Sequence, residues 1–180
     1  MTFFNTADTP VGGMTMVSDG ETLKVLAFTG QHLLREELPG AETPNLGVLK
    51  ALPVFDETRR WLDEFLEGHD PGFTPKLDPE GTPFQKDVWR LVQKIPYGQV
   101  TTYGTIAMEV AANRGIPKMS AQAVGGAVKR NPIALIVPCH RVVGADGNLV
   151  GYFGNLPLKA ELLQMEGQDM SRFYMPGEKR

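Results

Sequence analysis

The most constraining feature of the sequence is an apolar run that ends at a proline, directly before the only cysteine of the chain. Residues 133–137 are all aliphatic, and a short unbroken run of this kind predicts a buried strand. Pro138 has no backbone N–H and ends the strand, so we expect Cys139 to lie on a rigid turn at the strand's exit. A cysteine in this place is either a small core residue or a held nucleophile, and its position alone leaves both readings open.

The residues after Cys139 favour a nucleophilic cysteine over a small core residue. A thiol has an ordinary pKa of about 8.5 and becomes a strong nucleophile when a base or a positive charge favours the thiolate. His140 and Arg141 can supply that help. A single cysteine excludes an internal disulfide and dithiol redox chemistry. The other two histidines, His32 and His69, are too widely spaced to form a metal site with His140.

Composition limits the classes of protein to which the chain can belong. A chain of 180 residues with 42% hydrophobic content can bury one ordinary core or two small ones. No apolar run approaches the roughly 20 residues needed to cross a bilayer. The N-terminus has neither a basic region nor a long apolar region of the secretory kind, so we expect a cytoplasmic protein without membrane contact.

The net charge of −3 conceals an asymmetry. Residues 1–75 hold 5 Lys and Arg against 12 Asp and Glu, a net of −7, whereas residues 76–180 hold 13 against 9, a net of +4. Between Val110 and Ala145 no residue is acidic, and the basic residues there are Arg114, Lys118, Lys129, Arg130 and Arg141. This cluster is either a phosphate-binding surface or a set of ordinary solvated charges.

Residues 69–81 carry three prolines and two glycines and separate two parts of the chain. We place the boundary after Pro75, which gives an N-terminal α/β domain (1–75) and a C-terminal domain (76–180). The first part contains a predicted hairpin, residues 14–17 and 23–28 around a turn at 18–20, and a helix over 54–67. The predicted fold class is α+β, with a small N-terminal α/β lobe that has an antiparallel sheet and a helical C-terminal domain.

The C-terminal domain shows clear helix signals. Thr82, Pro83 and Gln85 form a capping box ahead of an apolar helical pattern that runs to Ile95. Helices over 103–111 and 120–129, joined by a turn at 114–118, predict a helix-turn-helix. A last helix is expected over 158–166, followed by a polar, loose tail.

The second helix of this pair is unusually rich in small residues. Its two adjacent glycines, Gly125 and Gly126, each cost a helix about 1 kcal/mol relative to alanine. Either a neighbouring helix or a nucleic-acid groove must approach closely there.

Taken together, the motifs of residues 73–167 resemble the O6-alkylguanine-DNA alkyltransferases. The resemblance rests on Pro138-Cys139-His140-Arg141-Val142, with Thr82-Pro83-Phe84-Gln85, Val88-Trp89, Ile95-Pro96-x-Gly98, Thr102-Tyr103, Ala123-Val124-Gly125, Asn131-Pro132, Gly151-Tyr152-x-Gly154 and Leu162-Leu163-x-x-Glu166-Gly167. It implies DNA repair by direct transfer of an alkyl group from O6-alkylguanine to the protein's own cysteine, and it leaves O4-alkylthymine open as a second substrate. Each molecule reacts once, on a base flipped out of double-stranded DNA, as a monomer and without a cofactor.

The resemblance also implies roles for five residues. Cys139 matches the alkyl acceptor, and His140 matches the histidine that deprotonates it through a bridging water. Glu166 matches the carboxylate that orients and charges this histidine, so we expect an imidazolium that keeps Cys139 ionised at neutral pH. Tyr103 matches the tyrosine that gives guanine a proton or hydrogen bond. Asn131 matches the asparagine that ties the cysteine loop to the recognition helix.

Further matches concern DNA and the base pocket. The DNA-binding positions are Thr102, Ser120, Ala121, Gln122, Gly125 and Lys129, and the pocket positions are Val142, Tyr152, Phe153 and Gly154. Gln122 stands where the family often has an arginine that enters the base stack, which predicts weaker base extrusion. Asn155 replaces a second glycine often found after Gly154. Two other readings stay open: a non-catalytic protein that binds alkylated DNA, and a helix-turn-helix regulator with an inert thiol.

Overall fold

The computed structural model describes residues 1–30, 48–153 and 155–178. The chain forms two compact units, Met1–Glu80 with Pro132–Ala134, and Gly81–Asn131 with Leu135–Arg180. Within the described ranges, no helix is both long and apolar enough to span a membrane.

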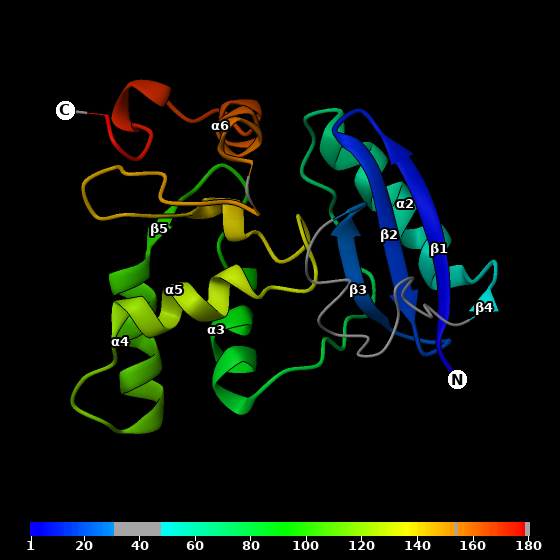
Figure 1. Cartoon of the computed structure of the whole chain (residues 1–180), viewed down its shortest axis with the longest axis horizontal. Coiled ribbons are helices and arrows are strands. Elements are labelled where there is room, and N and C mark those ends of the chain that lie inside the picture. Colours follow the sequence, from blue (N-terminus) through cyan, green and yellow to red (C-terminus); the bar gives the residue numbers. More distant parts are fainter. Residues whose placement is uncertain (31–47, 154, 179–180) are drawn as a thin grey trace. The chain divides into compact units, whose positions relative to one another are not determined.

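Unit 1 is built on a four-stranded sheet of order β3-β2-β1-β4 (Figure 1). Its strands are β1 (Phe3–Thr9), β2 (Gly12–Ser18), β3 (Leu23–Phe28) and β4 (Val48–Leu49). The predicted hairpin is the antiparallel pair β2 and β3, in which Met14 lies opposite Phe28. The sequence pattern did not predict β1, because its residues do not alternate regularly between apolar and polar, and most of them are only half-buried.

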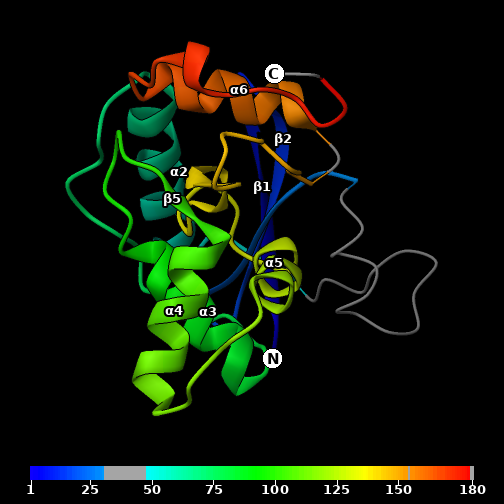
Figure 2. The ribbon, with the colours of Figure 1, turned by 90° about the vertical axis from the view of Figure 1, so that its left-hand side faces the viewer.

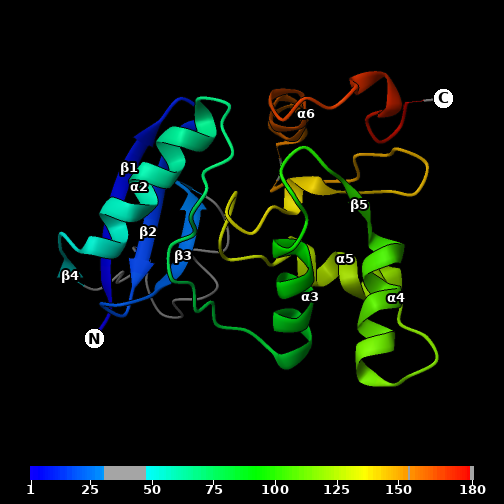
Figure 3. The same cartoon turned by 180° about the vertical axis from the view of Figure 1, so that it is seen from behind.

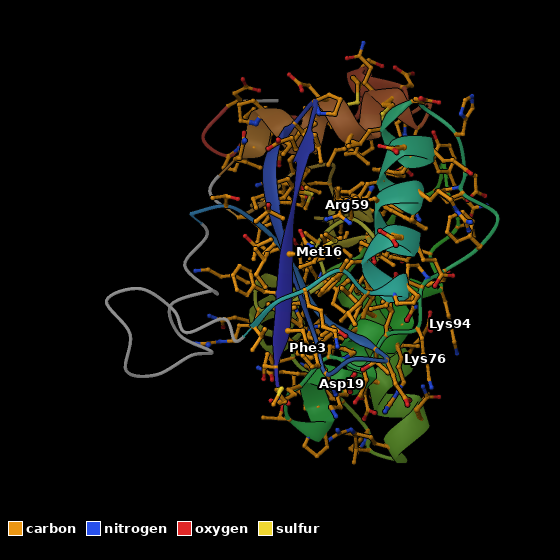
Figure 4. All side chains as sticks on the ribbon, turned by 90° about the vertical axis from the view of Figure 1, so that its right-hand side faces the viewer. Phe3, Met16, Asp19, Arg59, Lys76 and Lys94 are labelled. Carbon is orange, nitrogen blue, oxygen red and sulfur yellow. The ribbon has the colours of Figure 1, made fainter. Side chains whose placement is uncertain are left out.

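The helix α2 (Pro53–Leu66) packs on the sheet, as Figure 3 shows. Its buried face includes Phe55, Thr58, Leu62 and Phe65, all four of which the helical pattern predicted. Figure 4 shows Arg59 of the same helix beside the strands; its guanidinium donates to the Asn5 side chain (2.8 Å) and to the Thr6 carbonyl (2.9 Å). These bonds join α2 to β1.

Two segments outside the sheet complete unit 1. The Leu23 N–H donates to the Lys76 carbonyl (2.8 Å) and the Asp78 N–H donates to the Leu23 carbonyl (3.0 Å), so residues 76–78 belong with β3. The units therefore divide after Glu80, whereas we expected the boundary after Pro75.

The other segment is the start of the apolar run before the cysteine. The strand predicted over 133–137 is wrong: Ile133 forms one bridge with Leu26, and residues 134–136 form a turn. Leu135 adopts a φ of +69°, which ends extended pairing. All of these residues are buried, and burial alone does not distinguish a strand from a turn.

Unit 2 contains three neighbouring helices, α3 (Pro83–Gln93), α4 (Tyr103–Arg114) and α5 (Ala121–Lys129) (Figures 1 and 3). The predicted caps are present. Thr82 and Gln85 form the capping box, Thr102 caps α4 and Ser120 caps α5. Trp89 donates its indole N–H to the Ala127 carbonyl at the end of α5 (2.8 Å), which fixes α3 against α5.

Three shorter elements and a helix contain or surround the cysteine segment of unit 2 in the chain. They are β5 (Thr101–Thr102), the 3₁₀ helix η1 (Cys139–Arg141), β6 (Val142–Val143) and α6 (Leu156–Met165) (Figure 2). β5 pairs in parallel with β6, so Thr101 lies opposite Val142 and Thr102 opposite Val143. This pairing brings the start of α4 to the segment that follows the cysteine.

Residues 168–178 of the C-terminal tail have a defined fold, so the expectation of a loose tail is wrong for this segment. It contains the 3₁₀ helix η2 (Met170–Arg172), and Tyr174 exchanges backbone hydrogen bonds with Gly147 (3.1 Å) and Leu149 (3.0 Å). Its large apolar residues pack against a buried cluster of Val143, Leu149 and Leu163; these residues are Met170, Phe173 and Met175. The loop at 144–149 therefore has the tail as one of its supports.

Candidate active site

Cys139 opens η1 and is buried, with 5% of its surface exposed. Its N–H donates to the Val137 carbonyl (2.8 Å), and the Asn131 side chain donates to the same carbonyl (2.8 Å). The Asn131 amide also hydrogen bonds to the thiol. Because Asn131 directly follows the C-cap of α5, it joins the end of that helix to the cysteine turn, in the place the sequence predicted.

His140 and Glu166 meet in the interior of unit 2. His140 is fully buried, and its Nε2 hydrogen bonds with Oε2 of Glu166, the C-cap residue of α6. The other carboxylate oxygen, Oε1, accepts from the Gly98 N–H (3.0 Å) and from Nε of Arg141 (2.6 Å). The two residues are 26 positions apart in the chain, and the fold brings them into direct contact.

Gly98 is required by its conformation and by its surroundings. It has a φ of +77°, and a Cβ there would come within 3.2 Å of the Glu166 backbone oxygen. A larger residue would therefore disturb the carboxylate that contacts His140.

The protonation of the cysteine and histidine differs from the sequence-based expectation. Burial raises the pKa of Cys139 to about 11, although the Asn131 hydrogen bond and the positive charge of Lys159 act in the opposite direction. Burial likewise lowers the pKa of His140 below its ordinary value, against the pull of Glu166. The directions of these two pKa shifts favour a thiol beside a neutral imidazole at neutral pH, whereas we expected a thiolate and an imidazolium.

Lys159 lies beside this network, although the sequence pattern did not predict it as a site residue. It lies on α6, is fully buried, and donates from Nζ to three carbonyls, of Val142 (2.7 Å), Leu149 (2.5 Å) and Gly151 (3.1 Å). Burial lowers its pKa to about 8, and the nearby Cys139 opposes this. A lysine at an inward position of the helical pattern of α6 was the available signal, since lysine is rarely buried without partners.

Tyr103 is the first residue of α4 and is half-buried. Burial raises the pKa of its hydroxyl to about 12, with a further contribution from Cys139, so the phenol is protonated at neutral pH. Its ring lies 3.8 Å from the position of a Cβ on Gly125. Thr102 caps α4 by accepting from the Thr105 N–H (3.1 Å), which orients Tyr103.

The predicted pocket residues lie next to this network, except Gly154, which is outside the described residues. Val142 is fully buried, and Tyr152, which is 5% exposed, places its ring edge-on to His140 with 6.3 Å between centroids. Phe153 packs on Tyr152 at 4.9 Å. Phe153 and Val150 both have positive φ, +43° and +69°, so this segment is conformationally strained.

Relief of this strain is a testable consequence. Val150 is β-branched and 47% exposed, and its left-handed φ costs about 1–2 kcal/mol. Val150→Asn should raise the free energy of unfolding by about 0.5–1 kcal/mol, since asparagine tolerates this conformation. Urea denaturation measures the change. Val48→Asn, at a comparably exposed valine without positive φ, is the control, and an equal gain there would exclude strain as the cause.

Most of the residues predicted to contact DNA belong to α5 or its N-cap, and Thr102, the N-cap of α4, is half-buried. Ser120, Ala121, Gln122 and Lys129 are exposed, and Gly125 is half-buried against Tyr103. A Cβ on Gly126 would meet no atom within 4 Å among the described residues, so intrachain packing does not explain this glycine.

Two members of the expected basic cluster have other partners. Arg114 binds Asp87 through two nitrogens (3.1 and 2.8 Å), and Arg141 is buried on Glu166. Lys118 and Lys129 are exposed. Arg114 and Arg130 are exposed as well, so Arg141 is the one residue of the five that is buried.

These features together define a class of protein. Unit 2 combines a buried cysteine beside a histidine–carboxylate pair with a helix pair whose second helix has a small-residue, exposed face. Such a protein accepts a group on its own thiol and presents the second helix to nucleic acid. Among the described residues, no three His, Cys, Asp or Glu side chains gather as metal ligands.

Comparison with known proteins identifies the family. Residues 83–168 match the model described as "6-O-methylguanine DNA methyltransferase, DNA binding domain". The methylated-DNA–protein-cysteine methyltransferase of Methanosarcina acetivorans is 43% identical over 160 residues, covering 89% of this chain and 95% of the relative. That of Mycobacterium leprae is 40% identical over 159 residues and covers 88% of each chain.

Solved structures of similar fold support the same family. The O6-methylguanine methyltransferase of Mycobacterium tuberculosis superposes with a TM-score of 0.75 at 35% identity, covering 99% of this chain and 97% of the other. A second structure, of the same organism's OGT in complex with DNA, gives a TM-score of 0.73 at 36% identity, with 95% and 94% covered. The chain belongs to the methylated-DNA–protein-cysteine methyltransferase family.

Proposed function

We propose that this protein repairs alkylated double-stranded DNA by moving the alkyl group from O6 of guanine to Sγ of Cys139. It acts as a monomer in the cytoplasm, once per molecule and on a base turned out of the duplex. The observation that carries the assignment is the buried Cys139 in unit 2, held by Asn131 and followed directly by the histidine that contacts Glu166.

The chemistry follows from the resting protonation states. His140 is neutral and takes the thiol proton, because a thiol with a pKa of about 11 is a weak nucleophile until it loses that proton. An electron pair on Sγ then forms a bond to the alkyl carbon, while the carbon–O6 bond breaks and its electrons pass to guanine. Tyr103, protonated at neutral pH, gives guanine one proton. One proton enters His140 and one leaves Tyr103, so the total charge is unchanged.

Lys159 supports two parts of this reaction. Its ammonium group ties together the carbonyls of Val142, Leu149 and Gly151, which belong to the segment proposed to wall the base. Its positive charge also favours the Cys139 thiolate as it forms.

The proposal is tested by the fate of the methyl group. Incubation with duplex DNA that carries O6-methylguanine should add one methyl, and no more, to each chain, on the peptide that contains Cys139. Peptide mass spectrometry reads both the site and the stoichiometry. Binding to the lesion without any mass shift would contradict transfer and favour a non-catalytic sensor. Equal binding to undamaged DNA of a particular sequence would favour a regulator.

The exposed glycine of α5 gives a prediction for the DNA surface. Gly126→Leu should leave the fold intact or stabilise α5 by up to about 1 kcal/mol, because leucine is a much better helix former. DNA affinity should fall by roughly tenfold or more, because the larger side chain keeps the helix from the groove.

Fluorescence anisotropy with a labelled duplex measures this effect. Gln93→Leu, on the exposed last position of α3, is the matched control and should bind as the unmodified protein does. Unchanged affinity of the Gly126→Leu variant would show that α5 does not approach DNA at this position.

A further inference from the structure

Arg141 is the third member of the buried network around Glu166. Its side chain is 9% exposed, donates from Nε to Glu166 Oε1 (2.6 Å) and from Nη1 to the Ile95 carbonyl (2.8 Å). The guanidinium also lies 5.6 Å from the ring centroid of Tyr97. A planar group held on several sides has little freedom to leave the carboxylate.

The two oxygens of Glu166 have different partners. Oε2 meets His140, whereas Oε1 accepts from Arg141 and from the Gly98 N–H (3.0 Å). Arg141 therefore fixes which oxygen faces the imidazole. It also supplies a full positive charge to a carboxylate that would otherwise act on His140 alone.

We propose that Arg141 is a positioning residue for alkyl transfer: it orients Glu166 and balances its charge, so that His140 rests as a neutral base. This extends the proposed function, because it rests on His140 as the proton acceptor for Cys139. A histidine already charged by an unbalanced carboxylate could not take the thiol proton.

The charged groups that face His140 agree with this role. Glu166, at the end of α6, raises the pKa of His140, while Arg141 of η1 and Lys159 of α6 lower it together with burial. The neighbouring titratable side chains are Cys139 and Tyr152, both neutral at neutral pH because burial raises their pKa values. Arg141 is thus the cation that shares a carboxylate with His140.

The test measures His140 directly and the reaction separately. NMR titration of the imidazole in the free protein gives the His140 midpoint without DNA. Single-turnover methyl transfer between pH 5 and 9 gives the rate profile. In the unmodified protein, the His140 midpoint should lie below its ordinary value. In Arg141→Met, we expect that midpoint and the acid limb of the rate profile to rise together by about one pH unit or more.

Consequently, the transfer rate of Arg141→Met near pH 6 should fall by roughly tenfold and recover as the pH rises. Arg90→Met, at a mostly exposed arginine on α3, should change neither readout. If Arg141→Met does not fold, Arg141→Gln, which keeps an amide donor for Glu166 but no charge, should show the same upward shift.

An unchanged or lowered His140 midpoint in the folded variant would overturn the proposal, as would a rate reduced by the same factor at every pH. An upward shift in the NMR titration without methyl transfer in the unmodified protein would instead refute the proposed function and leave the electrostatic role of Arg141 in place.

Discussion

Cys139→Ser is expected to abolish methyl transfer, with a loss on the order of 10³-fold or more. A serine hydroxyl has nearly the shape of the thiol but is a far weaker nucleophile at neutral pH, and His140 alone does not ionise it. The measurement is single-turnover transfer from O6-methylguanine duplex, followed by mass spectrometry of the peptide around position 139.

The same variant should retain its fold and DNA binding, because Cys139 lies in the interior, whereas most of the predicted DNA contacts are exposed residues of α5 and its N-cap. A matched thermal melt and anisotropy titration establish this. The chain has no other cysteine, so the variant contains no thiol. Transfer by Cys139→Ser at a rate near that of the unmodified protein would therefore refute Cys139 as the acceptor.

Lys159→Met is expected to reduce the free energy of unfolding by about 3 kcal/mol. The substitution removes the ammonium donor from the carbonyls of Val142, Leu149 and Gly151, and the bonds to Val142 and Leu149 are buried. Each buried bond lost costs about 1–3 kcal/mol, and the relief of burying a charge offsets only part of this. Methyl transfer should slow as well, because the segment beside Tyr152 loses its support. Urea denaturation measures the stability.

Lys94→Met is the control, because Lys94 is exposed at the C-cap of α3 (Figure 4), and its effect should lie within about 0.5 kcal/mol. If Lys159→Met were as stable as this control, the hydrogen bonds from the ammonium group to the three carbonyls would not stabilise the fold, which would contradict this role of Lys159.

Lys159 also predicts a pH dependence of stability. Its pKa is about 8 in the folded protein and 10.5 as its ordinary value, so between these values the unfolded chain binds more protons than the folded one. The contribution of this group to the free energy of unfolding therefore rises with pH across that window. Lys159→Met should lack this rise, which denaturation series at pH 7.5 and 9.5 would reveal.

Local sequence signals predicted helices correctly where particular residue types recur at a short, fixed spacing. The capping box at Thr82, the caps at Thr102 and Ser120, and the apolar face of α2 each depend on residues within a few positions of one another. The family motifs around Cys139 likewise lie within short stretches. Such signals need no knowledge of the rest of the chain.

Other features depended on contacts between distant segments. Residues 133–137 are apolar in any fold, but only the bridge to Leu26 and the turn at Leu135 show that they are not a strand. The C-terminal tail looks polar by composition, and its order arises because Phe173 and its apolar neighbours find a cluster at Val143, Leu149 and Leu163.

The sequence by itself determined the class of protein, the acceptor cysteine and the helix pair, because these reside in local motifs. Only the tertiary structure decided the protonation states, the buried partners of Lys159 and the sharing of Glu166 between His140 and Arg141. The physical reason is that a charge's energy depends on burial and on neighbours within a few ångströms, and these neighbours come from segments far apart in the chain.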